Sequence, residues 1–78
     1  MKLDKGYVAD MITFLSYDAN LNVEYIGKSA AGSAAAEGTW SISKLIYDAN
    51  QNITQVLYAS GNKKFDKVWN DRASYSYS

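Results

Sequence analysis

One pattern occurs twice in this chain, and the repeat constrains the fold more than any other feature. The stretch YDANLNVEYI begins at Tyr17, and YDANQNITQV begins at Tyr47. In both copies, residues that favour strands stand before the Tyr-Asp pair and resume after the second Asn. Short runs of aliphatic, aromatic and Thr residues are typical of strands, while Asp and Asn are frequent turn residues. Each copy is therefore predicted to be a β-hairpin.

The strands of these hairpins follow from these runs of strand-forming residues. They are predicted over residues 10–17, 22–27, 39–47 and 53–59. The C-terminal stretch ASYSYS alternates strictly, so a short final strand is expected there. Because apolar residues occur on both faces of several strands, both faces of the sheet should need a cover.

An Ala-rich segment, KSAAGSAAAEG (residues 28–38), separates the two hairpins. Ser33 and the alanines favour one helical turn, which Gly32 and Gly38 restrict. We expect a loop that serves as a mobile or docking arm, because loops this long are uncommon in small domains. The predicted fold is all-β: one domain over residues 1–78, with two β-hairpins in a small antiparallel sheet or sandwich.

The small size of the chain points to association with other molecules. A single core in a chain of 78 residues contributes only about 3–5 kcal/mol, so such folds usually need extra stabilisation. The chain has no Cys and no His, which excludes disulfides, Cys-based zinc sites and Ser-His or Cys-His catalysis. Oligomerisation is the remaining means.

Charge and hydropathy exclude further classes of function. Eight basic and eight acidic residues give zero net charge without a basic stripe, which disfavours nucleic-acid binding. No apolar run approaches the roughly 20 residues of a membrane span, and Asp4 and Asp10 interrupt the N-terminus, unlike a signal peptide. No acidic pair or Gly-rich phosphate loop stands out. We therefore expect a non-enzymatic protein without a cofactor, made in a cytoplasm.

The repeated Asp-x-Asn-x-Asn has two interpretations, a calcium loop or a turn. Calcium requires several oxygen ligands, but the usual Gly is Val23 or Ile53 here, and no Glu closes the loop. Asp instead opens turns by accepting a bond from the backbone two residues on, and Asn tolerates the left-handed conformation. We interpret the repeat as turn chemistry without a metal. The turn residues are Asp18, Asn20, Asn22, Asp48, Asn50 and Asn52.

Two groups of aromatic residues leave alternatives open. In FDKVWNDR, Trp69 and Arg72 suit an interface anchor, whereas Phe65 and Trp69 together suit a plug at the open end of the sheet. Trp40 has the same ambiguity. With Tyr25, Tyr47 and Tyr58 it suits either a platform for a sugar ring or ordinary cross-strand packing.

The sequence from residue 39 to 78 resembles a group of small proteins encoded by tailed bacteriophages, and a weaker resemblance begins at residue 17. These proteins combine a Trp-strand-Tyr-Asp hairpin with a Phe-x-x-x-Trp-[Asp/Asn]-Asp-Arg-Ala-Ser-x-x-Tyr terminus. The matching residues are Trp40, Tyr47, Asp48, Phe65, Trp69, Asn70, Asp71, Arg72, Ala73, Ser74 and Tyr77. One departure is that Leu21 and Gln51 stand where Gly is more usual, which leaves the turn type open.

The resemblance implies a structural or accessory protein of the virion, at the head or the tail. Such a protein would oligomerise and decorate or stabilise a larger assembly, with copies of itself and other virion proteins as partners. The interface candidates are Phe65, Trp69, Arg72, Tyr75, Tyr77 and Trp40. The alternative is a small carbohydrate- or receptor-binding module displayed on a phage fibre.

Overall fold

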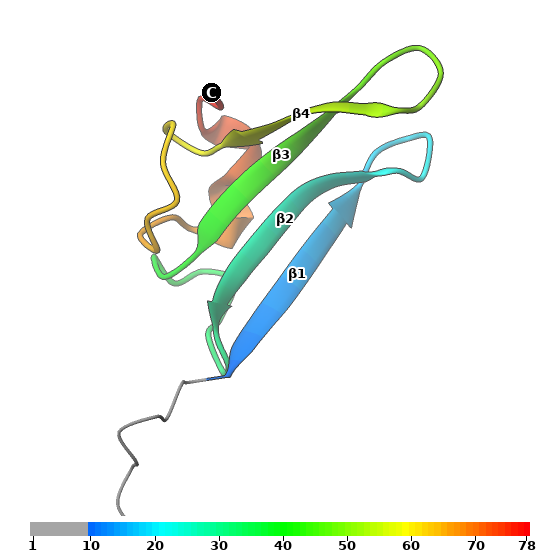
Figure 1. The fold of residues 1–78 in the computed structure, drawn as a ribbon. Coiled ribbons are helices and arrows are strands. Elements are labelled where there is room, and N and C mark those ends of the chain that lie inside the picture. Colours follow the sequence, from blue (N-terminus) through cyan, green and yellow to red (C-terminus); the bar gives the residue numbers. More distant parts are fainter. Residues whose placement is uncertain (1–9) are drawn as a thin grey trace, which may run out of the picture.

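The strand-forming segments form one antiparallel sheet with its strands in chain order (Figure 1). The computed structural model describes residues 10–78; residues 1–9, where the sequence predicts no strand or helix, lie outside that range. The elements are β1 (Met11–Tyr17), β2 (Val23–Ala30), β3 (Ser41–Tyr47), β4 (Ile53–Tyr58) and the 3₁₀ helix η1 (Trp69–Ser74). The all-β prediction with two hairpins is confirmed, and the hairpins share a single sheet.

The repeated sequence produces two hairpins of the same design. The register of each hairpin shifts just before its turn, between Ser16 and Tyr17 in the first and between Ile46 and Tyr47 in the second. Strands β2 and β3 join the hairpins, with Gly27 opposite Ile42. Equal sequences thus give equal bulges next to equal turns.

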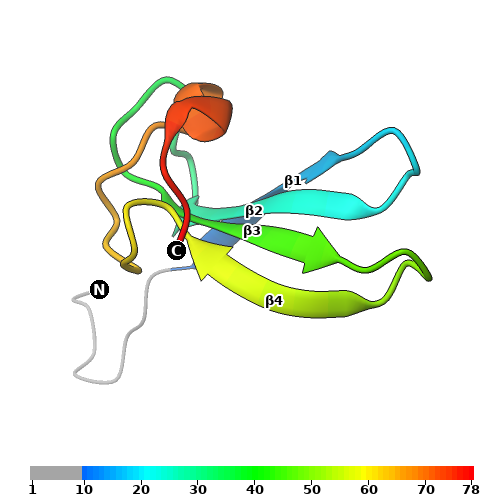
Figure 2. The same ribbon diagram turned by 90° about the horizontal axis from the view of Figure 1, so that it is seen from above.

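The core lies on one face of the sheet, at the end away from the hairpin turns. Figure 2 shows η1 over this face and the two turns projecting beyond it at the other end. Trp40 and Ile42 are fully buried there, and η1 supplies Trp69 from outside the sheet. The rings of Phe14 and Trp40 have centroids 4.4 Å apart, which places the aromatic cluster directly on β1 to β3.

Gly27 makes room for this cluster. A Cβ atom at Gly27 would overlap the Trp69 ring and lie 3.2 Å from Cε3 of Trp40. Glycine inside a strand often marks such a close approach. The lack of a side chain at Gly27 thus lets both indoles pack against the backbone of β2.

The Ala-rich loop begins later than the sequence predicts. Strand β2 continues through Ala30, and Ser29 is fully buried. The Ser29 hydroxyl is within hydrogen-bonding distance of Oγ of Ser33 (2.8 Å) and donates to the backbone oxygen of Thr39 (2.8 Å). These bonds satisfy a buried polar group, so residues 28–30 join the sheet although their composition resembles that of the loop.

The expected C-terminal strand is reduced to a single bridge between Ala59 and Tyr77. Ala73 and Ser74 instead complete η1, where the Ser74 hydroxyl donates to the backbone oxygen of Asp71 at 2.6 Å. The alternation of ASYSYS has another cause here. Tyr75 and Tyr77 both pack against the core, and the serines that alternate with them, Ser74, Ser76 and Ser78, stay exposed.

Candidate functional site

In the first hairpin turn, the Asp18 carboxylate binds the backbone. Its Oδ1 accepts bonds from the N–H groups of Asn20 (2.8 Å) and Asn22 (3.0 Å). The Leu21 N–H donates to the Asp18 carbonyl at 3.0 Å, and Leu21 has φ of 64°. A type I turn followed by a left-handed residue is a common three-residue hairpin connection, so the turn type is resolved without a glycine.

The second turn repeats this geometry. Oδ1 of Asp48 accepts from Asn50 (2.9 Å) and Asn52 (3.0 Å), and Gln51 has φ of 67°. The backbone bond from Asn52 is the main cause that lowers the pKa of Asp48 below its usual value. Residues 10–78 contain no cluster of three or more acidic side chains suited to a metal ion. In both turns, then, the acidic group shapes the backbone.

The segment from Phe65 to Arg72 divides between the two roles that the sequence left open. Trp69 is buried, and the Arg72 guanidinium lies over its ring at 4.6 Å from the centroid. Nη1 of Arg72 also donates to the Trp69 carbonyl at 3.3 Å. Phe65, by contrast, is 54% exposed. Trp69 is thus the core plug, and Phe65 is the aromatic member of the segment that a partner can reach.

The two C-terminal tyrosines bind other parts of the same segment. The hydroxyl of Tyr75 accepts a bond from the Val68 N–H at 2.8 Å, and that of Tyr77 donates to the Arg72 carbonyl at 2.6 Å. Burial, reinforced by Tyr25 and Tyr75, raises the pKa of Tyr77 well above its usual value. Both side chains hold η1 in place, and an interface role for them stays a prediction.

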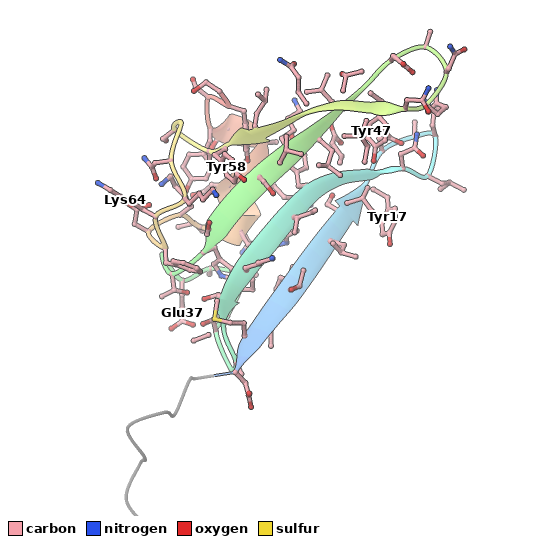
Figure 3. The ribbon with its side chains drawn as sticks, viewed as in Figure 1. Tyr17, Glu37, Tyr47, Tyr58 and Lys64 are labelled. Atoms are coloured by element: carbon pink, nitrogen blue, oxygen red, sulfur yellow. The ribbon has the colours of Figure 1, made fainter. Side chains whose placement is uncertain are left out.

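The aromatic residues considered as a sugar platform do not share an exposed surface. Trp40 has no exposed area and its indole N–H donates to the Ala34 carbonyl at 2.9 Å, while Tyr25 is also buried. Figure 3 shows Tyr47 and Tyr58 on β3 and β4. The Tyr47 hydroxyl donates to the Val23 carbonyl at 2.6 Å. Burial therefore argues against contact between a partner and Trp40 in this fold.

Lys67 is the buried cation of the described chain, and it is paired. Its ammonium group donates to Oδ1 of Asn62 at 3.1 Å and forms an ion pair with Asp66. The side-chain bond from Lys67 is the main cause that lowers the pKa of Asp66. The Lys67 backbone also exchanges two bonds of 2.9 Å with Trp40. This pair anchors the loop after β4, and its amine is not free for chemistry.

Most of the exposed large apolar side chains of residues 10–78 lie on the sheet face opposite η1 or border it. We call it the open face, because within residues 10–78 no helix or further sheet lies over it. Its large side chains are 47% to 56% exposed; they are Met11, Leu15, Tyr17, Val56 and Phe65. Figure 3 shows Tyr17 and Tyr58 at opposite ends of this sheet, on its two edge strands. The apolar residues within residues 11–17 were the sequence signal for this face.

Two shallow hollows border Phe65, one on the open face and one at the end of the sheet beside the Ala-rich loop. One is lined by Ile26, Lys28, Ser41, Ser43, Val56, Tyr58 and Lys63, and the other by Met11, Ser29, Ala30, Ser33 and Thr39. Neither hollow is lined by an acidic side chain. The Lys63 ammonium lies over the Tyr58 ring at 5.2 Å from its centroid. These hollows suit apolar side chains of a partner with a few hydrogen bonds from serine.

Comparisons with protein-family models, with curated proteins and with solved structures gave no match. The resemblance to small phage proteins therefore stays an expectation drawn from the residues. In the described part of the chain, η1 spans six residues, and no helix there is long and apolar enough to cross a membrane.

Proposed function

We propose that this chain is a non-enzymatic structural subunit that oligomerises and docks on a larger assembly through the open face of its sheet. The single observation that supports this role is the row of half-exposed apolar side chains on that face. Monomeric proteins rarely expose large contiguous apolar surfaces, and such surfaces commonly mark interaction sites. Met11, Leu15, Tyr17, Val56 and Phe65 suit burial against another apolar surface, and Lys28 and Lys63 on the same face suit a polar rim.

The virion of a tailed bacteriophage is the setting that we propose for this subunit. The resemblance of residues 39–78 supports it, and so does the small one-sided core, which gains stability when a second layer covers the sheet. Quantitative mass spectrometry of purified virions tests the setting. A copy number close to that of the major capsid protein would support decoration of the head, a low one a place at the neck or tail, and absence would overturn the setting.

A pair of neighbouring β4 residues tests the docking face itself. Val56 lies on the open face, and Gln55 is an exposed residue that points to the opposite side of the same strand. Val56→Asp should abolish docking on the larger assembly, measured as the copy number of the subunit in purified virions, because it buries a charge at the contact. Gln55→Asp should leave that copy number unchanged. Equal behaviour of both variants would contradict a docking role for the open face.

A further inference from the structure

The two edges of the sheet differ in how they are protected. At β4, the N–H and carbonyl of Tyr58 bind the carbonyl and N–H of Ser78, so the C-terminal segment covers one end of that edge. At β1, within residues 10–78, no second strand lies on the outer side. Natural proteins usually protect an open edge with Lys, Pro, a bulge or a cover. Met11 to Ser16 contain no charge, no proline and no bulge.

The backbone of β1 presents a defined set of free groups at this edge. The Ala31 N–H donates to the Asp10 carbonyl at 2.9 Å, which makes these two residues a hydrogen-bonded pair. Bonded and non-bonded pairs alternate along an antiparallel ladder. Ile12 and Phe14 therefore bond to β2, whereas Met11, Thr13 and Leu15 direct their N–H and carbonyl groups outward.

We propose that β1 pairs antiparallel with β1 of a second copy about a two-fold axis at Thr13. This joins two four-stranded sheets into one sheet of eight strands. In this register Thr13 faces Thr13 and Met11 faces Leu15 on the open face. Ile12 faces Phe14 on the core face, and Asp10 faces Ser16. The pairing rests on the oligomeric role proposed above and specifies its contact.

Charge favours the two-fold axis at Thr13 over an axis at the following residue, Phe14. An axis at Phe14 would also match the free backbone groups, but it would place Asp10 opposite Asp18 of the second copy at both ends. Like charges directly opposite each other destabilise a strand pair. With the axis at Thr13, the Asp10 carboxylate instead meets a serine hydroxyl, which can donate to it. Opposed threonines are also favourable cross-strand pairs.

A second copy is the occupant that this edge fits, because the same uncharged strand serves both sides of a closed two-fold contact. Pairing of β1 with the β4 edge of another copy would instead be a head-to-tail contact, which generates rings or filaments. The β4 edge is shorter because Ser78 occupies the backbone of Tyr58. In the closed pair, the open faces of both copies become one continuous surface for the larger assembly.

Single cysteines test the register directly, because the chain contains none of its own. Thr13→Cys places two thiols opposite each other across the axis, where strand geometry brings Cα atoms within disulfide range. We expect mild oxidation to convert most of this variant to a covalent dimer in non-reducing electrophoresis. Leu15→Cys is the matched control on the same strand and face, and it should remain largely uncrosslinked, since its partner is Met11. Equal crosslinking of both variants, or none at Thr13→Cys, would overturn the proposal.

Proline variants separate this contact from the alternatives. Thr13→Pro removes an outward N–H without breaking the bonds between β1 and β2, and edge strands tolerate proline at such positions. It should convert the dimer to a monomer in sedimentation velocity. Val56→Pro removes an outward N–H of β4, keeps an apolar side chain and should leave the dimer intact. Loss of association in Val56→Pro alone would overturn the β1 pairing in favour of a β4 contact. Loss of virion incorporation in Val56→Asp without crosslinking of Thr13→Cys would keep the docking function but reject the β1 pair.

Discussion

At the residue scale, both hairpin turns place a side chain where glycine would be under less strain. Leu21 and Gln51 hold left-handed φ values of 64° and 67°. That conformation costs a non-glycine residue about 1–2 kcal/mol. The Asp carboxylate of each turn offsets part of this cost through its two backbone bonds. Asp18 and Asp48 therefore stabilise the turns, although Leu21 and Gln51 disfavour the left-handed conformation that the turns require.

We expect Leu21→Gly to raise the free energy of unfolding by up to about 1 kcal/mol, since relief of strain outweighs the added chain entropy of glycine. Leu21 is 81% exposed, so little packing is lost. Urea denaturation measures the change. Gly32→Ala is the control and should lower the free energy of unfolding. Gly32 has φ of 91°, which strains alanine, and no neighbour lies within 4 Å of the added Cβ. A loss of stability in Leu21→Gly would mean that the leucine side chain has a packing role.

Gly27→Ala should destabilise the fold by about 1–3 kcal/mol, the usual cost of overpacking, because the new methyl group overlaps the Trp69 ring. Gly38→Ala is the matched control. Its nearest neighbours would lie 3.8 and 3.9 Å from the added Cβ, and denaturation should show almost no change. If Gly27→Ala were as stable as Gly38→Ala, the indoles would have to pack elsewhere.

At the element scale, the sequence predicted the strands of the hairpins well and the rest of the chain less well. Runs of strand-forming residues and turn residues are local signals, so β1 to β4 and their turns lie close to the predicted boundaries. The continuation of β2 through Ser29 depends on bonds to Ser33 and Thr39, which only the folded loop provides. The 3₁₀ helix depends likewise on Trp69 reaching Gly27, a contact without a sequence signal.

The same limit applied to the candidate site. The sequence could not show whether Trp40 and Trp69 are buried in the core or exposed as interface anchors, because tryptophan suits both positions. Burial of both indoles depends on η1 folding back over the sheet, which is a tertiary event. The sequence indicated apolar residues on both faces, such as Met11 and Leu15 on one and Ile12 and Phe14 on the other, but not which face the chain itself covers.

The attachment of η1 should weaken at alkaline pH, because Tyr77 then loses its proton. Its pKa is raised in the folded chain, mainly by burial, so folding favours the neutral hydroxyl. The corresponding stability is complete below the ordinary pKa of 10.0 and is lost as pH rises above it. Unfolding free energies measured from pH 8 to pH 11 should fall at the upper end. Tyr77→Phe should lose about 1 kcal/mol at neutral pH with the bond to Arg72, and should show a smaller alkaline decline. An equal decline in both proteins would contradict this role of Tyr77.

At the scale of the whole molecule, residues 10–78 cover the sheet on one face only. A one-sided core of this size is marginally stable, so association and folding should be linked. We expect the thermal midpoint of the natural chain to rise with protein concentration in calorimetry. The midpoint of Thr13→Pro, which removes the proposed β1 contact, should be lower and independent of concentration. A constant midpoint for the natural chain would indicate that the isolated subunit is monomeric.

The aromatic cluster should give the folded protein a distinctive circular dichroism signal. The chain contains two tryptophans, and both lie in the cluster with ring centroids 6.0 Å apart. Neighbouring indoles in a rigid, asymmetric setting couple their electronic transitions and produce strong circular dichroism. The circular dichroism of the two indoles therefore reports whether η1 is docked, because Trp69 belongs to η1 and Trp40 lies on the sheet. Events at the distant hairpin turns should leave this signal unchanged, so a change in it identifies release of the C-terminal segment.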